Sequence, residues 1–176
     1  MYIQVKLWLL KMKRNSCPLD LNGTGYCASF NFRRTARAVT RLYDTALQES
    51  GIRSTQFAIL VAIAKNQPVS IGTLADVLVI DSTTLTRSLR LLQKSGLVIV
   101  SNRAAMRQRF LTLTTKGEHA LARSLPAWRK THLRFVRTIG PEHWIELRSE
   151  LERLAHVARD LEKPEDKTPA LARINS

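Results

Sequence analysis

DSTTLTRSLRLLQKSGLV, residues 81–98, joins a helix start rich in serine and threonine to a strongly amphipathic second half. Asp81 has the chemistry of a helix N-cap, and Gly96 is placed to end the helix. Leu85, Leu89 and Leu92 recur at helical spacing and predict one buried stripe. The opposite face carries short hydroxyl side chains and two arginines: Ser82, Thr83, Thr84, Thr86, Arg87 and Arg90.

This polar face suits a helix that enters the major groove of DNA. Short side chains allow the backbone to approach, and hydroxyl groups bond to base edges or phosphates. The helix N-terminus itself favours phosphate, and arginine makes bidentate contacts with guanine. The residues between Asp81 and Gly96 are therefore predicted to form a recognition helix, with Arg87 as the preferred base reader. The competing interpretation is an ordinary solvated amphipathic helix.

The segments around this helix follow a recognisable order. Helical spacing is present at about 30–49, 56–65, 71–79, 115–138 and 141–161, and strand patterns at 97–100 and 109–114. Ser54 or Thr55 is the expected cap of the second helix, and Thr114 that of the long helix at 115–138. The order predicts a mainly α fold with a small β-hairpin wing, that is, a winged helix-turn-helix flanked by N- and C-terminal dimerisation helices.

The predicted domain organisation follows from this order. Residues 53–114 form the winged helix-turn-helix, and residues 27–52 and 115–162 form a helical dimerisation region. Residues 1–26 are expected to be a flexible or non-native extension, and residues 163–176 a flexible tail. An apolar stripe on the last helix is suited to seal a homodimer, although packing within one subunit is the alternative: Trp144, Leu147, Leu151, Leu154 and Val157.

The charge indicates a polyanionic partner. The net charge is +14 and the isoelectric point about 10.7. Between Ser82 and Lys116 there are seven Lys or Arg residues and no Asp or Glu. Three of them, Arg103, Arg107 and Arg109, lie in or beside the wing loop, where arginine can enter a minor groove. Double-stranded DNA is the expected partner.

Several other classes of function are not indicated. The chain has no phosphate-binding loop, dinucleotide turn or nucleophile elbow, and only seven glycines to build one, so no enzyme activity or cofactor is expected. Asp44 and Glu49 are interpreted as helix-surface charges. Histidine and cysteine spacings predict no metal site. No apolar run is long enough to span a membrane, and without a secretory signal we expect a cytoplasmic protein.

The segment RSTQFAILVAIAKNQPVSIGTLADVLVIDSTTLTRSLRLLQKSGLV, with the basic wing and LTLTTKG that follow, closely resembles the MarR family of winged-helix transcriptional regulators. The resemblance covers roughly residues 27–160. It implies a homodimer that reads a pseudo-palindromic operator, most often as a repressor released by a small aromatic or phenolic ligand or by an oxidant. Ala105 stands where such wings usually carry an aspartate, whereas Arg107 keeps the family's arginine.

The same resemblance suggests where a ligand or an oxidant would act. A ligand cleft in this architecture lies between the dimerisation helices and the reading head, although each candidate lining residue also suits a plain core: Phe30, Phe57, His119, Trp128 and His132. Cys27 is the redox candidate, because a peroxide-sensing branch of the family carries a cysteine near this helix start. That cysteine aligns nearer to Ser29, and the alternative for Cys27 is a small buried apolar residue.

One alternative keeps the fold and changes the function. A nonspecific or architectural DNA-binding protein would use the same charge without reading a sequence. Salt dependence together with site preference separates the two possibilities, because a nonspecific binder loses affinity steeply with salt and prefers no site. On the specific hypothesis, substitution of Arg87 relaxes site preference, whereas substitution of Arg103 weakens binding to every duplex alike.

Overall fold

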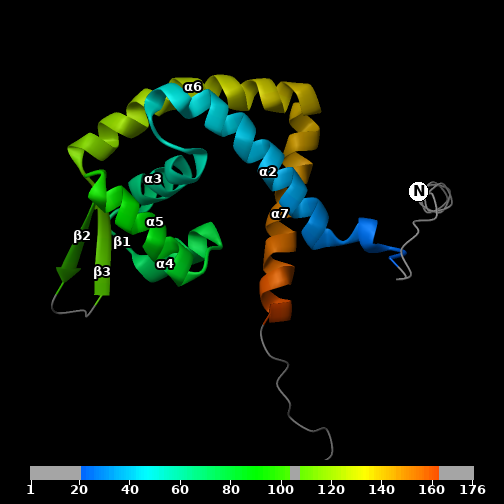
Figure 1. Ribbon diagram of the computed structural model, residues 1–176, viewed down its shortest axis with the longest axis horizontal. Helices are drawn as coiled ribbons and strands as arrows, with labels where there is room; N and C mark the ends of the chain where they lie inside the picture. Colours follow the sequence, from blue (N-terminus) through cyan, green and yellow to red (C-terminus); the bar gives the residue numbers. More distant parts are fainter. Residues whose placement is uncertain (1–20, 104–107, 163–176) are drawn as a thin grey trace, which may run out of the picture.

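A long N-terminal helix leads into a small head, residues 54–113, and two further long helices follow the head (Figure 1). The computed structural model describes residues 21–103 and 108–162. The helices are η1 (Thr24–Tyr26), α2 (Ala28–Leu47), η2 (Gln48–Ser50), α3 (Ser54–Asn66), α4 (Ile71–Leu78), α5 (Ser82–Lys94), α6 (Thr115–Ile139) and α7 (Pro141–Glu162). The strands are β1 (Val69–Ser70), β2 (Val98–Arg103) and β3 (Gln108–Leu113).

The strands form one antiparallel sheet in the order β1-β3-β2. Leu111 of β3 lies opposite Val69 on one side and Val100 on the other. The predicted hairpin of β2 and β3 is therefore confirmed, and the short strand β1 extends it on the β3 side. Because Leu111, Val69 and Val98 are buried, this end of the sheet is fixed to the helical core of the head.

The core of the head lies where α3, α4 and α5 meet the sheet. Leu60, Ile63, Leu74, Leu85 and Leu92 are completely inaccessible to solvent. Five residues of α3 are buried, among them Phe57 and Ile59. The leucine stripe predicted for α5 is the face that packs into this core. The opposite face of α5 is consequently held outwards.

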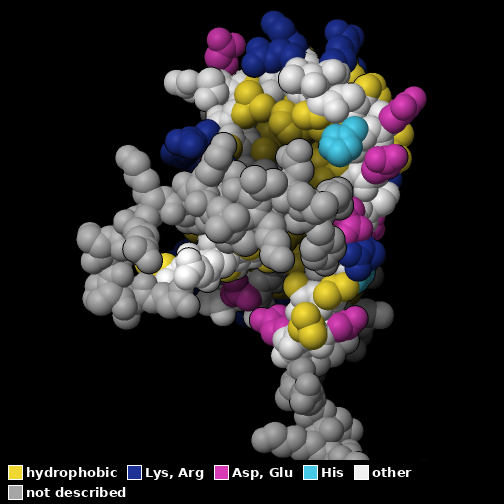
Figure 2. All heavy atoms as spheres, turned by 90° about the vertical axis from the view of Figure 1, so that its right-hand side faces the viewer, with side chains coloured by type: hydrophobic (Ala, Val, Ile, Leu, Met, Phe, Trp, Pro, Cys, Tyr) yellow, Lys and Arg dark blue, Asp and Glu magenta, His cyan; other side chains and the backbone are white. Residues whose placement is uncertain are grey.

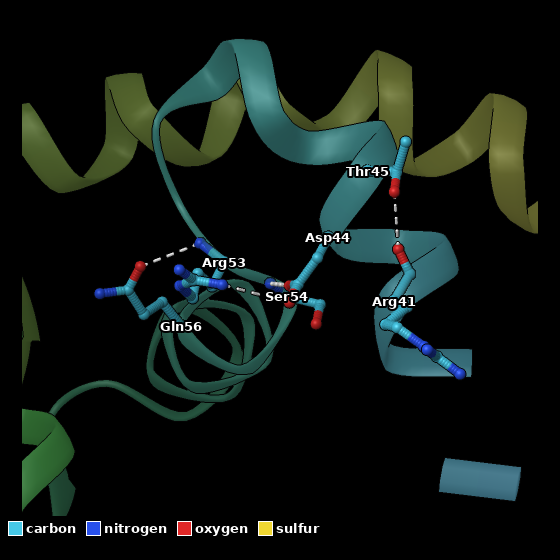
Figure 3. Close-up of polar contacts among 6 residues, drawn as sticks. All are labelled: Arg41, Asp44, Thr45, Arg53, Ser54 and Gln56. Carbon is cyan, nitrogen blue, oxygen red and sulfur yellow. Dashed lines mark hydrogen bonds and ion pairs between the residues drawn. The ribbon is translucent and has the colours of Figure 1, made fainter. Parts of the chain in front are cut away.

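A carboxylate fixes the junction between α2 and α3 (Figure 3). Asp44 of α2 accepts a hydrogen bond from the backbone N–H of Ser54 at 2.7 Å, and its other oxygen lies 3.7 Å from the Arg53 guanidinium. The Gln56 side chain accepts a bond from the backbone N–H of Arg53. The prediction that Ser54 or Thr55 caps α3 is therefore wrong, because Arg53 holds the cap position. Asp44 is half-buried rather than a plain surface charge.

The two C-terminal helices run along the upper edge and one side of the molecule (Figure 1). Thr114 caps α6 as predicted, since its hydroxyl oxygen accepts a bond from the N–H of Gly117 at 2.9 Å. α6 continues through Pro126, and α7 begins at Pro141, where the absence of an N–H costs nothing. Near its start α6 is pressed against the head, because a Cβ on Gly117 would lie 2.1 Å from the carbonyl oxygen of Leu97.

The chain before α2 is partly built into the fold. Residues Thr24–Tyr26 form a turn of 3₁₀-helix that leads into α2. The Asn31 side chain donates hydrogen bonds to the carbonyl oxygens of Gly25 and Cys27, at 2.9 and 3.0 Å. The last residues of the predicted extension 1–26 thus contact α2. Residues 1–20 and the predicted tail 163–176 lie outside the described residues.

Candidate nucleic-acid interface

The predicted recognition helix, α5, is fixed at its start and along its inner face. The Asp81 carboxylate accepts a hydrogen bond from the backbone N–H of Thr84 at 2.8 Å. Hydrogen bonds from the side chain and the backbone of Thr84 hold the pKa of Asp81 below its usual range, so that the cap is ionised at neutral pH. Leu85, Leu89 and Leu92 anchor the inner face with at most 2% of their surface exposed. Rotation of the helix about its axis would expose these leucines.

The outer face of α5 brings together most of the predicted DNA-binding residues. One shallow hollow of about 280 Å³ is lined by five of them, which we call the recognition face: Ser82, Thr83, Thr86, Arg87 and Arg90. Thr84 is also exposed but does not line this hollow. Arg87 and Arg90 are exposed, and neither forms an ion pair with any described residue. Both guanidinium groups are free to bind an anion or a base edge.

A second hollow connects the recognition helix to the wing. It has a volume of about 250 Å³, and its polar lining comes from Thr86, Arg90 and Gln93 of α5 and Arg109 of β3. Thr86 and Arg90 line both hollows, so the two form one continuous surface. Gln93 was not among the predicted residues. Its spacing could have identified it, because it lies three residues after Arg90 and seven after Thr86.

The helix start differs in one respect from the sequence interpretation. The Asp81 carboxylate already accepts a hydrogen bond from an N–H group at the positive end of α5, and it adds a negative charge there. This arrangement makes the end of the helix less attractive to a phosphate than a free helix N-terminus would be. The Thr86 hydroxyl donates to the carbonyl oxygen of Ser82 at 2.6 Å, which leaves its oxygen to act towards DNA only as an acceptor. Thr86 is therefore a weaker candidate for reading a base than Arg87 and Arg90, which form no ion pair with any described residue.

The wing carries the remaining predicted residues. Arg109 is exposed on β3, where its backbone pairs with Asn102 of β2. Arg103 is the last residue of β2 and pairs in register with Gln108. Arg107 and Ala105 lie outside the described residues. Of the three predicted wing arginines, Arg109 is the one that the structure places beside the recognition helix.

A separate cavity lies between the head and the long helices α2 and α6. Its volume is about 590 Å³, within the range of small-molecule sites. Its walls come from α2, α3, the end of α4 and Trp128 of α6, and they are largely apolar. Phe57 and Trp128 stack on each other with ring centroids 5.8 Å apart, and both line the cavity. Two of the five predicted ligand-binding residues thus meet there.

The other predicted ligand-binding residues lie at different distances from this cavity. His132 stacks on Trp128 at 4.9 Å, and its Nδ1 lies 3.2 Å from the hydroxyl of Tyr43, a lining residue. Burial raises the pKa of Tyr43, which keeps this hydroxyl protonated. Phe30 is exposed near the start of α2, and His119 is exposed near the start of α6. The structure does not bring those two into the cavity.

Cys27 stands immediately before α2, with its side chain exposed and its thiol free. The alternative of a buried apolar cysteine is therefore wrong. Within residues 21–103 and 108–162, no group of three His, Cys, Asp or Glu side chains is arranged to hold a metal ion. Nor does that part of the chain contain a helix with the length and apolar character needed to cross a membrane.

Comparisons with known proteins agree with this geometry. A family model described as MarR family matches residues 50–108. The transcriptional regulator MosR of M. tuberculosis, solved in complex with DNA, is 33% identical, with a TM-score of 0.72 over 77% of this chain and 98% of that chain. A second structure of MosR from M. tuberculosis is 32% identical, with a TM-score of 0.67 over 76% of this chain and 96% of that chain.

A more distant structure shows the same fold. A mutant of MarR from E. coli, complexed with operator DNA, is 22% identical, with a TM-score of 0.67 over 77% of this chain and 99% of that chain. No match was found among the curated proteins. The identity to MosR, over nearly all of its length, is high enough to assign a family. The chain belongs to the MarR family of DNA-binding winged-helix transcriptional regulators.

Proposed function

We propose that the chain is a cytoplasmic repressor that binds double-stranded DNA as a homodimer on a pseudo-palindromic operator. One observation carries the sequence-specific part of this proposal. Arg87 and Arg90 share a hollow with three short hydroxyl side chains, on the face of α5 opposite its buried leucines. Arginine in a major groove makes the bidentate guanine contact, which gives about 1–3 kcal/mol of discrimination per base pair.

Fluorescence anisotropy tests this proposal with two duplexes at two salt concentrations. One duplex comes from upstream of the chain's own gene, and the other is its scrambled sequence. A preference for the upstream duplex that survives the higher salt is the expected result. Arg87→Ala should reduce that preference by about tenfold or more. Lys94→Ala is the matched control, because Lys94 is exposed at the other end of α5 and lines neither hollow.

The net charge of +14 favours a second candidate, a nonspecific or architectural DNA-binding protein. The same titrations separate the two functions. Equal binding to both duplexes, lost together as the salt concentration rises, would assign the affinity to phosphate contacts alone. In that case Arg87→Ala and Lys94→Ala would weaken binding by similar factors.

Uncovered apolar side chains support the homodimer. Phe30 and Phe32 of α2 are 52% and 46% exposed, and Leu151 and Val157 of the stripe on α7 are each 40% exposed. The stripe on α7 is thus incompletely covered within one subunit, which favours an interface over internal packing. Leu151→Asp should shift the protein from dimer to monomer in sedimentation velocity. Ser149→Asp, on the same exposed helix, should leave the dimer unchanged.

The cavity beside Trp128 is the proposed site for a small aromatic effector. Its apolar walls suit an aromatic ring, while Tyr43 and Lys65 at its lining offer a hydroxyl and a cation to a phenol or a carboxylate. Isothermal titration with 4-hydroxybenzoate is a direct test. Ala58→Phe should fill the cavity and abolish binding without changing DNA affinity. Equal heats for both proteins would remove this site from the proposal.

Cys27 is the proposed site for release by an oxidant, since its thiol is free and exposed. Peroxide should weaken DNA binding of the wild type, and Cys27→Ser should bind DNA normally and lose the peroxide response. If the Cys27→Ser protein still responds to peroxide, oxidation acts elsewhere. The two regulatory proposals are independent, because Cys27 does not line the cavity.

A further inference from the structure

The outer side of α6 carries a row of cations that the recognition face does not use. Four exposed cations follow one another at intervals of seven, four and three residues, and we call them the α6 stripe: Arg123, Lys130, Arg134 and Arg137. At 3.6 residues per turn these intervals place all four on one side of the helix. At 1.5 Å per residue the row is about 21 Å long.

The stripe points away from the head. The buried residues of α6 are Gly117, Ala120 and Ser124, which lie on the side of the helix that faces the rest of the molecule. α6 forms the upper edge of the molecule with α5 beneath it (Figure 1), and Figure 2 shows Lys and Arg side chains projecting from this upper edge. A duplex bound to α5 would therefore lie on the other side of the head from the stripe.

The charge of the stripe is not neutralised within the described part of the chain. None of its four members forms an ion pair there. Glu118 is the only acidic residue of α6, and it lies in the first turn. Around the C-terminal end of the stripe, Lys130, Arg134 and Arg137 line a hollow of about 510 Å³. Three cations around one hollow form a local field that attracts a polyanion.

We propose that the α6 stripe binds a second DNA duplex, so that one protein molecule holds two segments of DNA. A straight row about 21 Å long would lie along a length of duplex that carries about a dozen phosphates on its two strands, since a duplex has one charge per roughly 1.7 Å of axis. A membrane-binding helix would need a broad apolar face beside its cations, and Leu133 is the one large apolar residue of α6 that is strongly exposed. The exposed apolar side chains that support the proposed dimer lie on α2 and α7, and none of them belongs to the stripe, although α6 is part of the predicted dimerisation region.

A two-duplex capture experiment tests this proposal. A biotinylated 30-bp duplex on beads is saturated with the full-length protein at low salt, and a fluorescent 30-bp duplex of random sequence is then added. The wild type should retain the second duplex. Lys130→Gln combined with Arg134→Gln should weaken this capture by at least about tenfold, since each lost phosphate contact contributes nearly tenfold in 0.1 M salt. Its affinity for the first duplex, measured separately by anisotropy, should stay within about twofold.

The matched control removes the same charge from other exposed positions. Arg129→Gln combined with Arg148→Gln changes one cation on another side of α6 and one on α7, and should capture the second duplex as the wild type does. Absence of capture by the wild type, or equal capture by the stripe variant, would overturn the proposal. Equal losses in both double variants would also overturn it, because net charge alone would then be responsible. Failure of binding to the first duplex would instead count against the function of α5.

Discussion

Arg159, near the end of α7, holds the C-terminal end of α4 through Asp76. The guanidinium Nη2 donates a hydrogen bond to the backbone carbonyl oxygen of Asp76 at 2.8 Å and lies 3.9 Å from its carboxylate. The same carbonyl oxygen accepts the N–H of Val79, which begins the turn into α5 in a left-handed conformation with φ of 52°. A cation at a helix C-terminus also suits the helix dipole. The helix α7 and the turn of the helix-turn-helix are thus joined at the carbonyl group of Asp76.

We predict that Arg159→Ala loosens this turn with little effect on global stability. The side chains of Arg159 and Asp76 are 36% and 82% exposed, and exposed ion pairs contribute only about 0–1 kcal/mol. Amide hydrogen exchange should accelerate at Val79 and Ile80, while the free energy of unfolding changes by less than about 1 kcal/mol. Arg148→Ala, on the same helix, should leave these amides as protected as in the wild type. Unchanged exchange in Arg159→Ala would show that the contact does not hold the turn.

The contact of Gly117 with Leu97 leads to a second prediction. Alanine normally stabilises a helix interior relative to glycine by about 1 kcal/mol. At Gly117 a Cβ would lie 2.1 Å from a backbone oxygen, so α6 or the start of β2 would have to move. Gly117→Ala should therefore lower the free energy of unfolding by about 1–3 kcal/mol in urea titrations.

Gly72→Ala is the control for this steric argument. Gly72 is also helical, but its Cβ would meet nothing closer than the Ser70 hydroxyl oxygen at 3.9 Å. This substitution should be neutral or slightly stabilising. A Gly117→Ala protein as stable as Gly72→Ala would mean that α6 is not pressed against Leu97.

Periodicity and capping chemistry predicted the parts of the fold in which neighbouring residues decide the structure. The leucines of α5, its cap at Asp81 and the cap of α6 at Thr114 all depend on residues within one or two turns of each other. The polar face of α5 could be predicted for the same reason. Once Leu85, Leu89 and Leu92 are buried, Arg87 and Arg90 must point outwards.

Contacts between residues distant in sequence could not be predicted in this way. Asp44 accepts a hydrogen bond from the first residue of a helix that begins ten residues later, which depends on how α2 turns into α3. Val77 of α4 is 53% exposed and lines the cavity beside α2. The cavity itself needs walls from four helices, so Phe57 and Trp128 could be proposed from their type but Val77 could not.

The ionised form of Asp44 leads to a prediction about pH. The hydrogen bonds from Ser54, and then the charge of Arg53, hold the pKa of Asp44 below its usual range in the folded state. Its contribution to stability is therefore complete above the unfolded pKa near 4 and is lost as the pH falls through the lower folded value. Asp44→Asn keeps an oxygen for the Ser54 N–H but cannot titrate. The difference in unfolding free energy between wild type and Asp44→Asn should shrink between about pH 5 and pH 2, as followed by urea titration. Parallel curves would refute the role of the carboxylate charge.

The last prediction concerns the negative charge that Asp81 places at the start of the recognition helix. This charge stabilises α5 but repels phosphates, so Asp81→Asn should keep the hydrogen bond from Thr84 and bind every duplex more tightly, by about threefold to tenfold at low salt. Asp81→Ala should show the same gain in affinity together with a lower melting temperature, because it removes the cap as well. Anisotropy titrations at increasing salt check the cause, since the gain must fall as the charge is screened. If Asp81→Asn binds DNA no more tightly than the wild type at low salt, the start of α5 does not approach the phosphates.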